Sequence, residues 1–264
     1  MRSEAEEAAR IDGLHGELLA AGESVPGVRE VLARRDPDEE TVLGVLRRAV
    51  PARFLEHVGT TPPWSERPRV LARVVLHPRA PRALSLRLVS SLFWRDLADV
   101  AATPHVPAAV RVRAEAALGE LLDDMRLGDR VTLAKVATPA LLPRLLVDAD
   151  RKVTAAALVN RRLREEDVLT ALRLPEAPLA LIEAVGASPK WAEVYGVRLA
   201  LVLQPRTPLP VALLQISSLV KRDLVRVAEA TGVRPLLQAS ARAVLERLSA
   251  DTPLRPRTSK GSVT

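Results

Sequence analysis

Apolar residues recur along this chain at spacings of three and four positions, with charged residues between them. Such spacing places the apolar side chains on one stripe of an α-helix. No segment shows the sustained alternation of apolar and polar residues that is typical of strands. The pattern therefore predicts an all-α protein. In residues 107–121, for example, the residues at this spacing are Val110, Ala114, Ala117, Leu118 and Leu121.

Prolines divide this pattern into short segments. The 21 prolines of the chain leave room only for helices of about 8–15 residues. Several of these prolines follow a residue with a side-chain oxygen. That oxygen can accept a hydrogen bond from a free N–H at the start of a helix. Proline is tolerated at the first helical position because the N–H it lacks would have no partner within the helix there. We therefore expect helices to begin at Asp36-Pro37, Thr61-Pro62, Thr103-Pro104, Thr138-Pro139, Ser188-Pro189 and Thr207-Pro208, the first within a capping box, Asp36-Pro37-Asp38-Glu39.

The chain also repeats itself. Residues 54–121 align without a gap on residues 181–248, and 26 of the 68 aligned positions are identical. Weaker similarity extends the match back to about residues 14 and 141. We interpret this as an internal duplication with halves at 14–121 and 141–248. The matched residues include Val58-Gly59 with Val185-Gly186, Pro78-Arg79 with Pro205-Arg206, and Ser90-Ser91-Leu92 with Ser217-Ser218-Leu219.

The duplication sets the expected organisation of the chain. One third of the 127-residue offset is about 42 residues, which fits one helix pair with its loops and lies in the period range of HEAT and armadillo units. The expected segments are a helix start at 1–13, a first half at 14–121, a junction helix at 122–140, a second half at 141–249 and a disordered basic tail at 250–264.

The central stretch carries a family resemblance. Residues 128–160 read as a small-apolar helix, a Thr-Pro start, a Leu-rich second helix and an Asp-led third, and residues 160–169 continue the pattern. This arrangement resembles bacterial HEAT-like α-solenoids, including the leucine-rich-repeat-variant type. The resemblance implies a stack of short antiparallel helix pairs whose face binds or scaffolds another molecule, and it implies no catalytic residues. Because the spacings vary, a compact two-lobed helical domain is the alternative.

Candidate chemistry is sparse. The chain has no cysteine, which excludes disulfides and thiolate sites. It has no phosphate-binding glycine loop and no nucleophile motif. The four histidines lack metal-ligand spacing, so we expect them to be structural or exposed: His15, His57, His77 and His105. We therefore predict a protein that is not an enzyme and that has no metal, no cofactor and no small-molecule substrate.

Two sets of residues recur at matched positions. Trp64 and Trp191 each follow a Ser/Thr-Pro pair, and we interpret them as wedges that fill gaps between helix layers. A duplicated pair of aromatic pockets is the alternative interpretation. The other set consists of charged pairs, expected to bridge or cap an interhelix turn: Arg95 with Asp96, and Arg222 with Asp223.

One charge feature points to a binding face. The formal net charge is +7, and only five of the 39 basic residues are lysines. Guanidinium forks can hold phosphates or an acidic protein surface, although arginine stems also cover apolar surface on solvated faces. The candidate face holds seven arginines and no acid: Arg67, Arg69, Arg73, Arg79, Arg82, Arg87 and Arg95.

These observations favour a scaffold or adaptor that binds another protein, with an acidic surface, along the face of a solenoid. The alternative is nucleic-acid binding through residues 67–95, similar to HEAT-like DNA glycosylases, with Asp96 beside Trp94 as the nearest local match. A third hypothesis is a helical subunit of a membrane-associated assembly. The sequence shows no secretory signal and no stretch long enough to span a membrane, so we expect a cytoplasmic protein.

Overall fold

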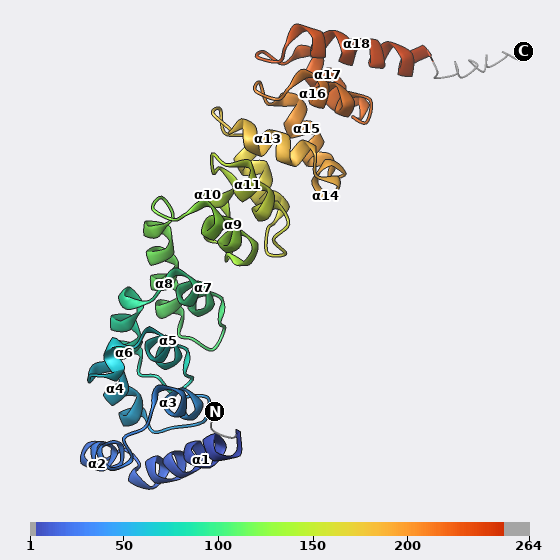
Figure 1. Ribbon diagram of the computed structural model, residues 1–264. Coiled ribbons are helices and arrows are strands. Elements are labelled where there is room, and N and C mark those ends of the chain that lie inside the picture. Colours follow the sequence, from blue (N-terminus) through green and yellow to red (C-terminus); the bar gives the residue numbers. More distant parts are fainter. Residues whose placement is uncertain (1–3, 251–264) are drawn as a thin grey trace, which may run out of the picture. The chain divides into compact units, whose positions relative to one another are not determined.

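The computed structural model describes residues 4–250, and every regular element in that range is a helix (Figure 1). The all-α prediction is confirmed. The chain divides into two compact units, with the boundary between Leu141 and Leu142. The tail predicted at 250–264 lies outside the described residues from position 251 onward.

Unit 1 arranges its helices in two rows. Helices α1, α3, α5, α7 and α9 contact one another in succession, and α2, α4, α6 and α8 do the same in a second row (Figure 1). The elements are α1 (Glu4–Ala21), α2 (Val25–Arg35), α3 (Glu39–Val45), α4 (Ala52–Thr60), the 3₁₀ turn η1 (Trp64–Glu66), α5 (Pro68–Leu76), α6 (Arg82–Leu88), the 3₁₀ turn η2 (Val89–Ser91), α7 (Trp94–Ala102), α8 (Ala108–Leu121) and α9 (Leu127–Val136).

Unit 2 has a comparable row, in which α10, α12, α15 and α17 contact one another in succession. Helices α11 and α13 pack together, as do α16 and α18. The elements are α10 (Leu142–Leu146), α11 (Arg151–Leu158), α12 (Glu165–Leu172), α13 (Leu179–Gly186), α14 (Pro189–Ala192), α15 (Tyr195–Leu203), α16 (Leu209–Ile216), α17 (Lys221–Glu229) and α18 (Pro235–Ala250).

Helix boundaries follow the 127-residue offset. Helices α5 and α15 begin and end 127 positions apart, and so do α7 and α17. Helices α6 and α16, and α8 and α18, begin 127 positions apart. Residues separated by 127 are called corresponding residues below, and between α3 and α12 the offset is 126. The correspondence allows one unit to be compared with the other, residue by residue.

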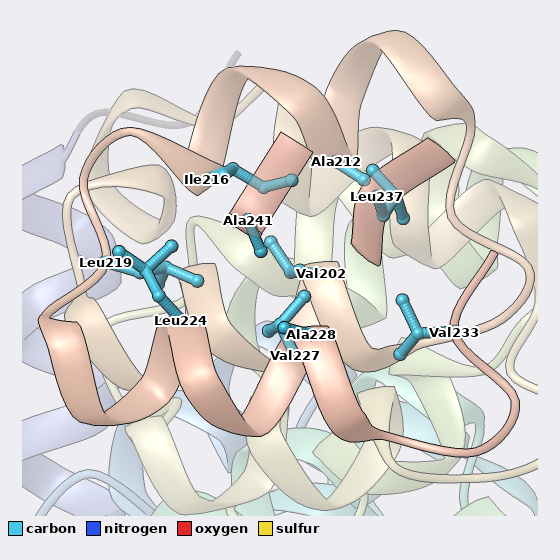
Figure 2. Close-up of a cluster of buried hydrophobic side chains, with 10 residues drawn as sticks. All are labelled: Val202, Ala212, Ile216, Leu219, Leu224, Val227, Ala228, Val233, Leu237 and Ala241. Atoms are coloured by element: carbon cyan, nitrogen blue, oxygen red, sulfur yellow. The ribbon is translucent and has the colours of Figure 1, made fainter. Parts of the chain in front are cut away.

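Each unit is held together by aliphatic side chains on the inward stripes of its helices. Figure 2 shows one such cluster in unit 2, where Val202 of α15 lies among side chains of α16, α17 and α18. Its buried neighbours include Ile216, Leu224 and Leu237. Fully burying an aliphatic side chain of this size contributes about 1.5–3 kcal/mol. The inward face of α15 is therefore fixed, while its outward face is left for other contacts.

The prolines do not start helices in the way that the sequence predicted. Thr61 and Thr103 end α4 and α7, and the helices that follow begin several residues later. Of the six predicted pairs, only Ser188-Pro189 begins a helix, α14, and it does so without a side-chain cap. A residue before proline is driven to extended backbone, which ends a helix. Prolines instead occupy the position just before a helix, as Pro51, Pro81, Pro107, Pro178 and Pro208 do.

Three other prolines form tight turns between helices. His77, Leu174 and Gln204 each precede a proline, and the carbonyl of each accepts a hydrogen bond from the N–H three residues later, at 2.9–3.1 Å. Proline suits the second position of such a turn because its backbone φ is already set near the required value. The turns connect the end of one helix to the start of the next.

The predicted capping box was also displaced. Asp38, not Asp36, caps α3, and its carboxylate accepts hydrogen bonds from the N–H and the hydroxyl of Thr41. Asp36 has a left-handed backbone, with a φ of 38°, and ends α2. Asp36 therefore ends one helix and Asp38 begins the next, with Pro37 between them.

Candidate binding site

The structure distributes the seven candidate arginines over both helix rows of unit 1. Arg67, Arg69 and Arg73 lie at or on α5, and Arg95 lies on α7 in the same row. Arg82 and Arg87 lie on α6, which belongs to the other row, and Arg79 lies in the connecting turn. The acid-free stretch of sequence therefore does not form one continuous face.

Glutamates from earlier in the chain compensate three of these arginines. Arg67 pairs with Glu39 at 3.1 Å, Arg69 with Glu40 at 2.6 Å, and Arg79 with Glu23 at 3.5 Å. These pairs are exposed, so each contributes little to stability. They do reduce the positive potential of the surface, which the linear sequence did not reveal.

The other four candidate arginines make no ion pair within residues 4–250. The guanidinium of Arg95 lies over the ring of Trp94, 5.2 Å from its centre. Arg73, Arg82 and Arg87 have exposed side chains. Arg73 differs from the other two because it lines a concave part of the surface.

Two adjoining hollows lie along α3, α5 and α7, and together they are called the unit 1 hollow. Their volumes are about 360 Å³ and 240 Å³, and both are lined by Arg47, Arg73 and Leu76. The larger part is bordered by four arginines and two histidines, with no acidic side chain among the described residues that line it. Its lining residues are Leu46, Arg47, Arg48, Ala49, Arg73, Leu76, His77, Pro78, Arg79 and His105.

Two of the four arginines carry uncompensated charge. Arg48 pairs with Asp12 at 2.6 Å, and Arg79 pairs with Glu23. Arg47 and Arg73 are exposed and make no ion pair among the described residues. Sequence reasoning missed Arg47 and Arg48 because they precede the acid-free stretch, and only the packing of α3 against α5 brings them beside Arg73.

The smaller part of the unit 1 hollow has a mixed lining. Asp96 and Asp99 of α7 lie there with Arg69 and Arg73 of α5. Partial burial raises the pKa of the Asp96 carboxyl above its ordinary value, and the negative charge of Asp99 raises it further. This end of the hollow therefore offers both signs of charge.

His77 has a structural role at the edge of the unit 1 hollow. Its Nδ1 accepts from the N–H of Arg79 at 3.1 Å, so the neutral ring carries its proton on Nε2 and donates it to the carbonyl of Arg48 at 2.9 Å. The corresponding residue, Gln204, makes the same kind of contacts: it donates to the Leu172 carbonyl and accepts from the N–H of Arg206. Histidine and glutamine can replace each other because each presents a donor and an acceptor at this spacing.

A hollow at the corresponding place in unit 2 has different chemistry. It has a volume of about 340 Å³ and lies along α12, α15 and α17. Arg69 and Arg73 are replaced by Gly196 and Ala200, so the floor is apolar. We call this the unit 2 hollow. Its lining residues are Leu172, Arg173, Pro175, Gly196, Leu199, Ala200, Leu203, Gln204, Pro205 and Arg226.

The two predicted Arg-Asp pairs also differ between the units. Asp223 is buried, and it accepts a hydrogen bond from the Tyr195 hydroxyl at 2.5 Å, while Arg222 lies 3.9 Å away. The corresponding Asp96 has no such partner, because Pro68 stands where unit 2 has Tyr195. One aspartate therefore belongs to the interior of its unit, and the other lines a surface hollow.

Both repeated tryptophans are packed inside their units. Trp191 is 3% exposed, and its Nε1 donates to the Leu158 carbonyl at 2.9 Å. Trp64 is 9% exposed and lies in η1, which is separated from α5 by Arg67. In each unit the short helical segment that carries the tryptophan, η1 or α14, ends before the next helix, α5 or α15, begins.

Another hollow of unit 1, of about 620 Å³, is partly lined by Trp64. Most of its charges are used internally, because Asp38 caps α3 and pairs with Arg10, and Glu39 pairs with Arg67. The two charged lining residues that make no ion pair among the described residues, Arg29 and Asp36, have opposite signs. Burial lowers the pKa of His57 in this hollow below its ordinary value. It therefore offers less free charge than the unit 1 hollow.

Comparisons with protein-family models, curated proteins and solved structures find no match to this chain. Within residues 4–250, no group of three or more histidine, aspartate or glutamate side chains could hold a metal ion. In the same range no helix combines the length and apolarity needed to cross a membrane.

Proposed function

We propose that this protein is a non-enzymatic scaffold or adaptor that binds an acidic segment of another protein in the unit 1 hollow. The observation that carries the proposal is the lining of the larger part of that hollow, where four arginines and two histidines are present without an acidic side chain. Guanidinium groups form paired hydrogen bonds to carboxylates, which gives both strength and orientation.

The chemistry of the hollow favours a polypeptide. Leu46, Ala49 and Leu76 provide apolar surface between the charged side chains, and an acidic peptide with aliphatic residues would bury that surface. Arg47 and Arg73 are available for carboxylates because no ion pair occupies them. The aspartates at the smaller end suit a basic residue on the same segment.

Nucleic-acid binding is the second candidate, and Arg73, Arg82 and Arg87 favour it because they are exposed and unpaired. Duplex binding requires several free cations along one track. The glutamate pairs of Arg67, Arg69 and Arg79 interrupt such a track. These features rank the nucleic-acid hypothesis below the protein-binding one.

The test compares charge reversals inside and outside the hollow. Binding of a fluorescein-labelled, glutamate-rich peptide is measured by anisotropy for the wild type, for Arg47→Glu/Arg73→Glu, and for the control Arg82→Glu/Arg87→Glu. We expect the first variant to weaken binding by about ten-fold or more and the control to leave it unchanged. Circular dichroism confirms that both variants are folded.

Two outcomes would overturn this proposal. Equal losses in both variants would show a diffuse electrostatic effect with no site in the hollow. A labelled DNA duplex that binds more tightly than the peptide, with a steep salt dependence, and that is lost in Arg82→Glu/Arg87→Glu would support the nucleic-acid candidate.

A further inference from the structure

We propose that the unit 2 hollow is a second, independent binding site, and that it takes an apolar side chain flanked by acidic residues on a peptide segment of a partner protein. The site differs from the unit 1 hollow in its floor, its rim and its helices. The inference goes beyond the proposed function because it depends on no residue of unit 1.

The floor of the unit 2 hollow is apolar and partly accessible. Leu199, Ala200 and Leu203 of α15 are partly exposed, and Leu172 borders them from the end of α12. Leu199 and Leu203 also pack against the buried cluster behind the floor. At about 340 Å³, the hollow falls within the usual range of ligand pockets, about 300–1,000 Å³. It therefore suits a single leucine-sized or aromatic side chain.

The floor is rigidly supported from behind. On the inward face of α15, Val197, Leu201 and Val202 are buried, and Val202 packs into the cluster with α16, α17 and α18 (Figure 2). A floor that is fixed before binding does not lose conformational entropy when a side chain docks on it. The hollow is thus pre-formed by the core of its own unit.

A glycine keeps the first turn of α15 close to α12. A Cβ atom at position 196 would lie 2.9 Å from the Oε1 atom of Glu165 and 3.5 Å from the Cδ1 atom of Leu169. The corresponding position in unit 1 holds Arg69. Gly196 therefore allows close packing, and it contributes no charge of its own where the Glu165 carboxylate adjoins this edge of the floor.

The rim supplies positive charge on two sides. Arg173 follows the end of α12, and Arg226 lies on α17, while α15 contacts both helices and lies between them. Both arginines are exposed, and neither makes an ion pair within residues 4–250. Among the described residues no acidic side chain is part of the lining, and the nearest carboxylate, that of Glu165, adjoins the floor at Gly196. Charge complementarity therefore predicts carboxylates on both sides of the docked apolar group.

The polar groups at the end of the hollow do not compete for the ligand. The Gln204 amide donates to the carbonyls of Leu172 and Leu174 and accepts from the N–H of Arg206. The nearby Asp223 carboxylate is occupied by Tyr195. Recognition is therefore left to the apolar floor and the two arginines, in the arrangement of an anchor residue with charged neighbours.

The experiment uses fluorescein-labelled peptides in which a leucine is flanked by glutamates, with a second peptide carrying serine in place of leucine. Three variants are compared: Ala200→Arg and Arg226→Asp, which introduce the residue types of the corresponding unit 1 positions, and the exposed control Arg247→Asp on α18. We expect the wild type to prefer the leucine peptide by about ten-fold. Ala200→Arg should abolish this preference, Arg226→Asp should weaken binding of the leucine peptide by a similar factor, and Arg247→Asp should change neither.

The result is separable from the test of the proposed function. Arg47→Glu/Arg73→Glu should keep the preference for leucine over serine even where it weakens acidic-peptide binding in general. Equal binding of the two peptides by the wild type would overturn the inference, as would a preference that survives Ala200→Arg in a folded protein. Octanoate binding with the same variant pattern, without peptide binding, would show that the occupant is an aliphatic carboxylate and not a peptide.

Discussion

The hollows of the two units occupy corresponding places but have different chemistry. In unit 1, α5 contributes Arg69 and Arg73 to the hollow, while α15 contributes Gly196 and Ala200 in unit 2. The helices that carry these residues begin and end at corresponding positions. This comparison of the two units indicates that helix packing determines where a hollow forms, whereas a few residues that line it determine what it can bind.

The acidic residues show the same divergence. Asp223 is 4% exposed and bonded to Tyr195, whereas Asp96 lines the unit 1 hollow beside Asp99. Both units have an aspartate at this position, but the residue at the start of the adjacent helix differs: it is Pro68 in α5 and Tyr195 in α15. Proline removes the hydroxyl that would have held the Asp96 carboxylate inside.

The largest expected effect separates the two tryptophans. Trp191→Ala should lower the free energy of unfolding by about 3–5 kcal/mol, because it opens a cavity and leaves the Leu158 carbonyl without its donor. Trp64→Ala should cost less, since Trp64 is more exposed and its indole N–H makes no hydrogen bond within residues 4–250. Urea unfolding followed by far-ultraviolet circular dichroism measures both; equal losses would contradict the comparison.

A smaller effect should come from the Tyr195 hydroxyl. Tyr195→Phe removes the donor to Asp223 and the acceptor for the N–H of Val220, so we expect a loss of about 1–3 kcal/mol in the free energy of unfolding. A double-mutant cycle with Asp223→Asn measures the coupling between the two side chains. A coupling energy near zero would mean that the hydroxyl does not hold the buried carboxylate.

The smallest effect on the free energy of unfolding should come from Asp96→Asn, which should stabilise the protein where the other substitutions destabilise it. Because the folded-state pKa of Asp96 is raised, the protonated form favours folding, and this contribution is lost as the pH rises through that raised pKa. At neutral pH Asp96→Asn should therefore stabilise the protein slightly, by less than about 0.5 kcal/mol. The difference in the free energy of unfolding between Asp96→Asn and the wild type should shrink as the pH falls below the ordinary aspartate pKa of about 3.9.

Unfolding measured as a function of pH for the Asp96→Asn and Asp223→Asn variants checks this sign. Asp223→Asn should destabilise the protein at neutral pH, because the hydroxyl of Tyr195 would then donate to a neutral amide oxygen, which is a weaker acceptor than the carboxylate. If Asp96→Asn also destabilises it there, Asp96 has a stabilising partner and its environment resembles that of Asp223.

The candidate site was only partly predictable from sequence. Arg73 was among the predicted residues, but Arg82 and Arg87 lie on the other helix row and line neither part of the unit 1 hollow. Arg47 and Arg48 were missed, because a site formed by three helices draws residues from segments about 25 positions apart. Charge counted along a stretch cannot show which arginines are paired with glutamates of the preceding helix.

The proline interpretation failed for a local reason. A proline restricts the residue before it as well as itself, so Thr61 and Thr103 end helices instead of capping the next ones. The hydroxyl of Thr103 instead donates to the carbonyl of Asp99, four residues earlier in α7. The pattern of oxygen-bearing residue and proline marks interhelix turns as well as helix starts.

The sequence by itself determined that the described chain is helical and that positions 127 apart are alike, because apolar spacing and proline placement are properties of local segments. Tertiary structure decided which side chains meet. Packing of α3, α5 and α7 gathered the arginines of the unit 1 hollow, and packing of α12, α15 and α17 left an apolar floor between Arg173 and Arg226. Binding chemistry depends on distances between residues remote in sequence, and folding alone fixes those distances.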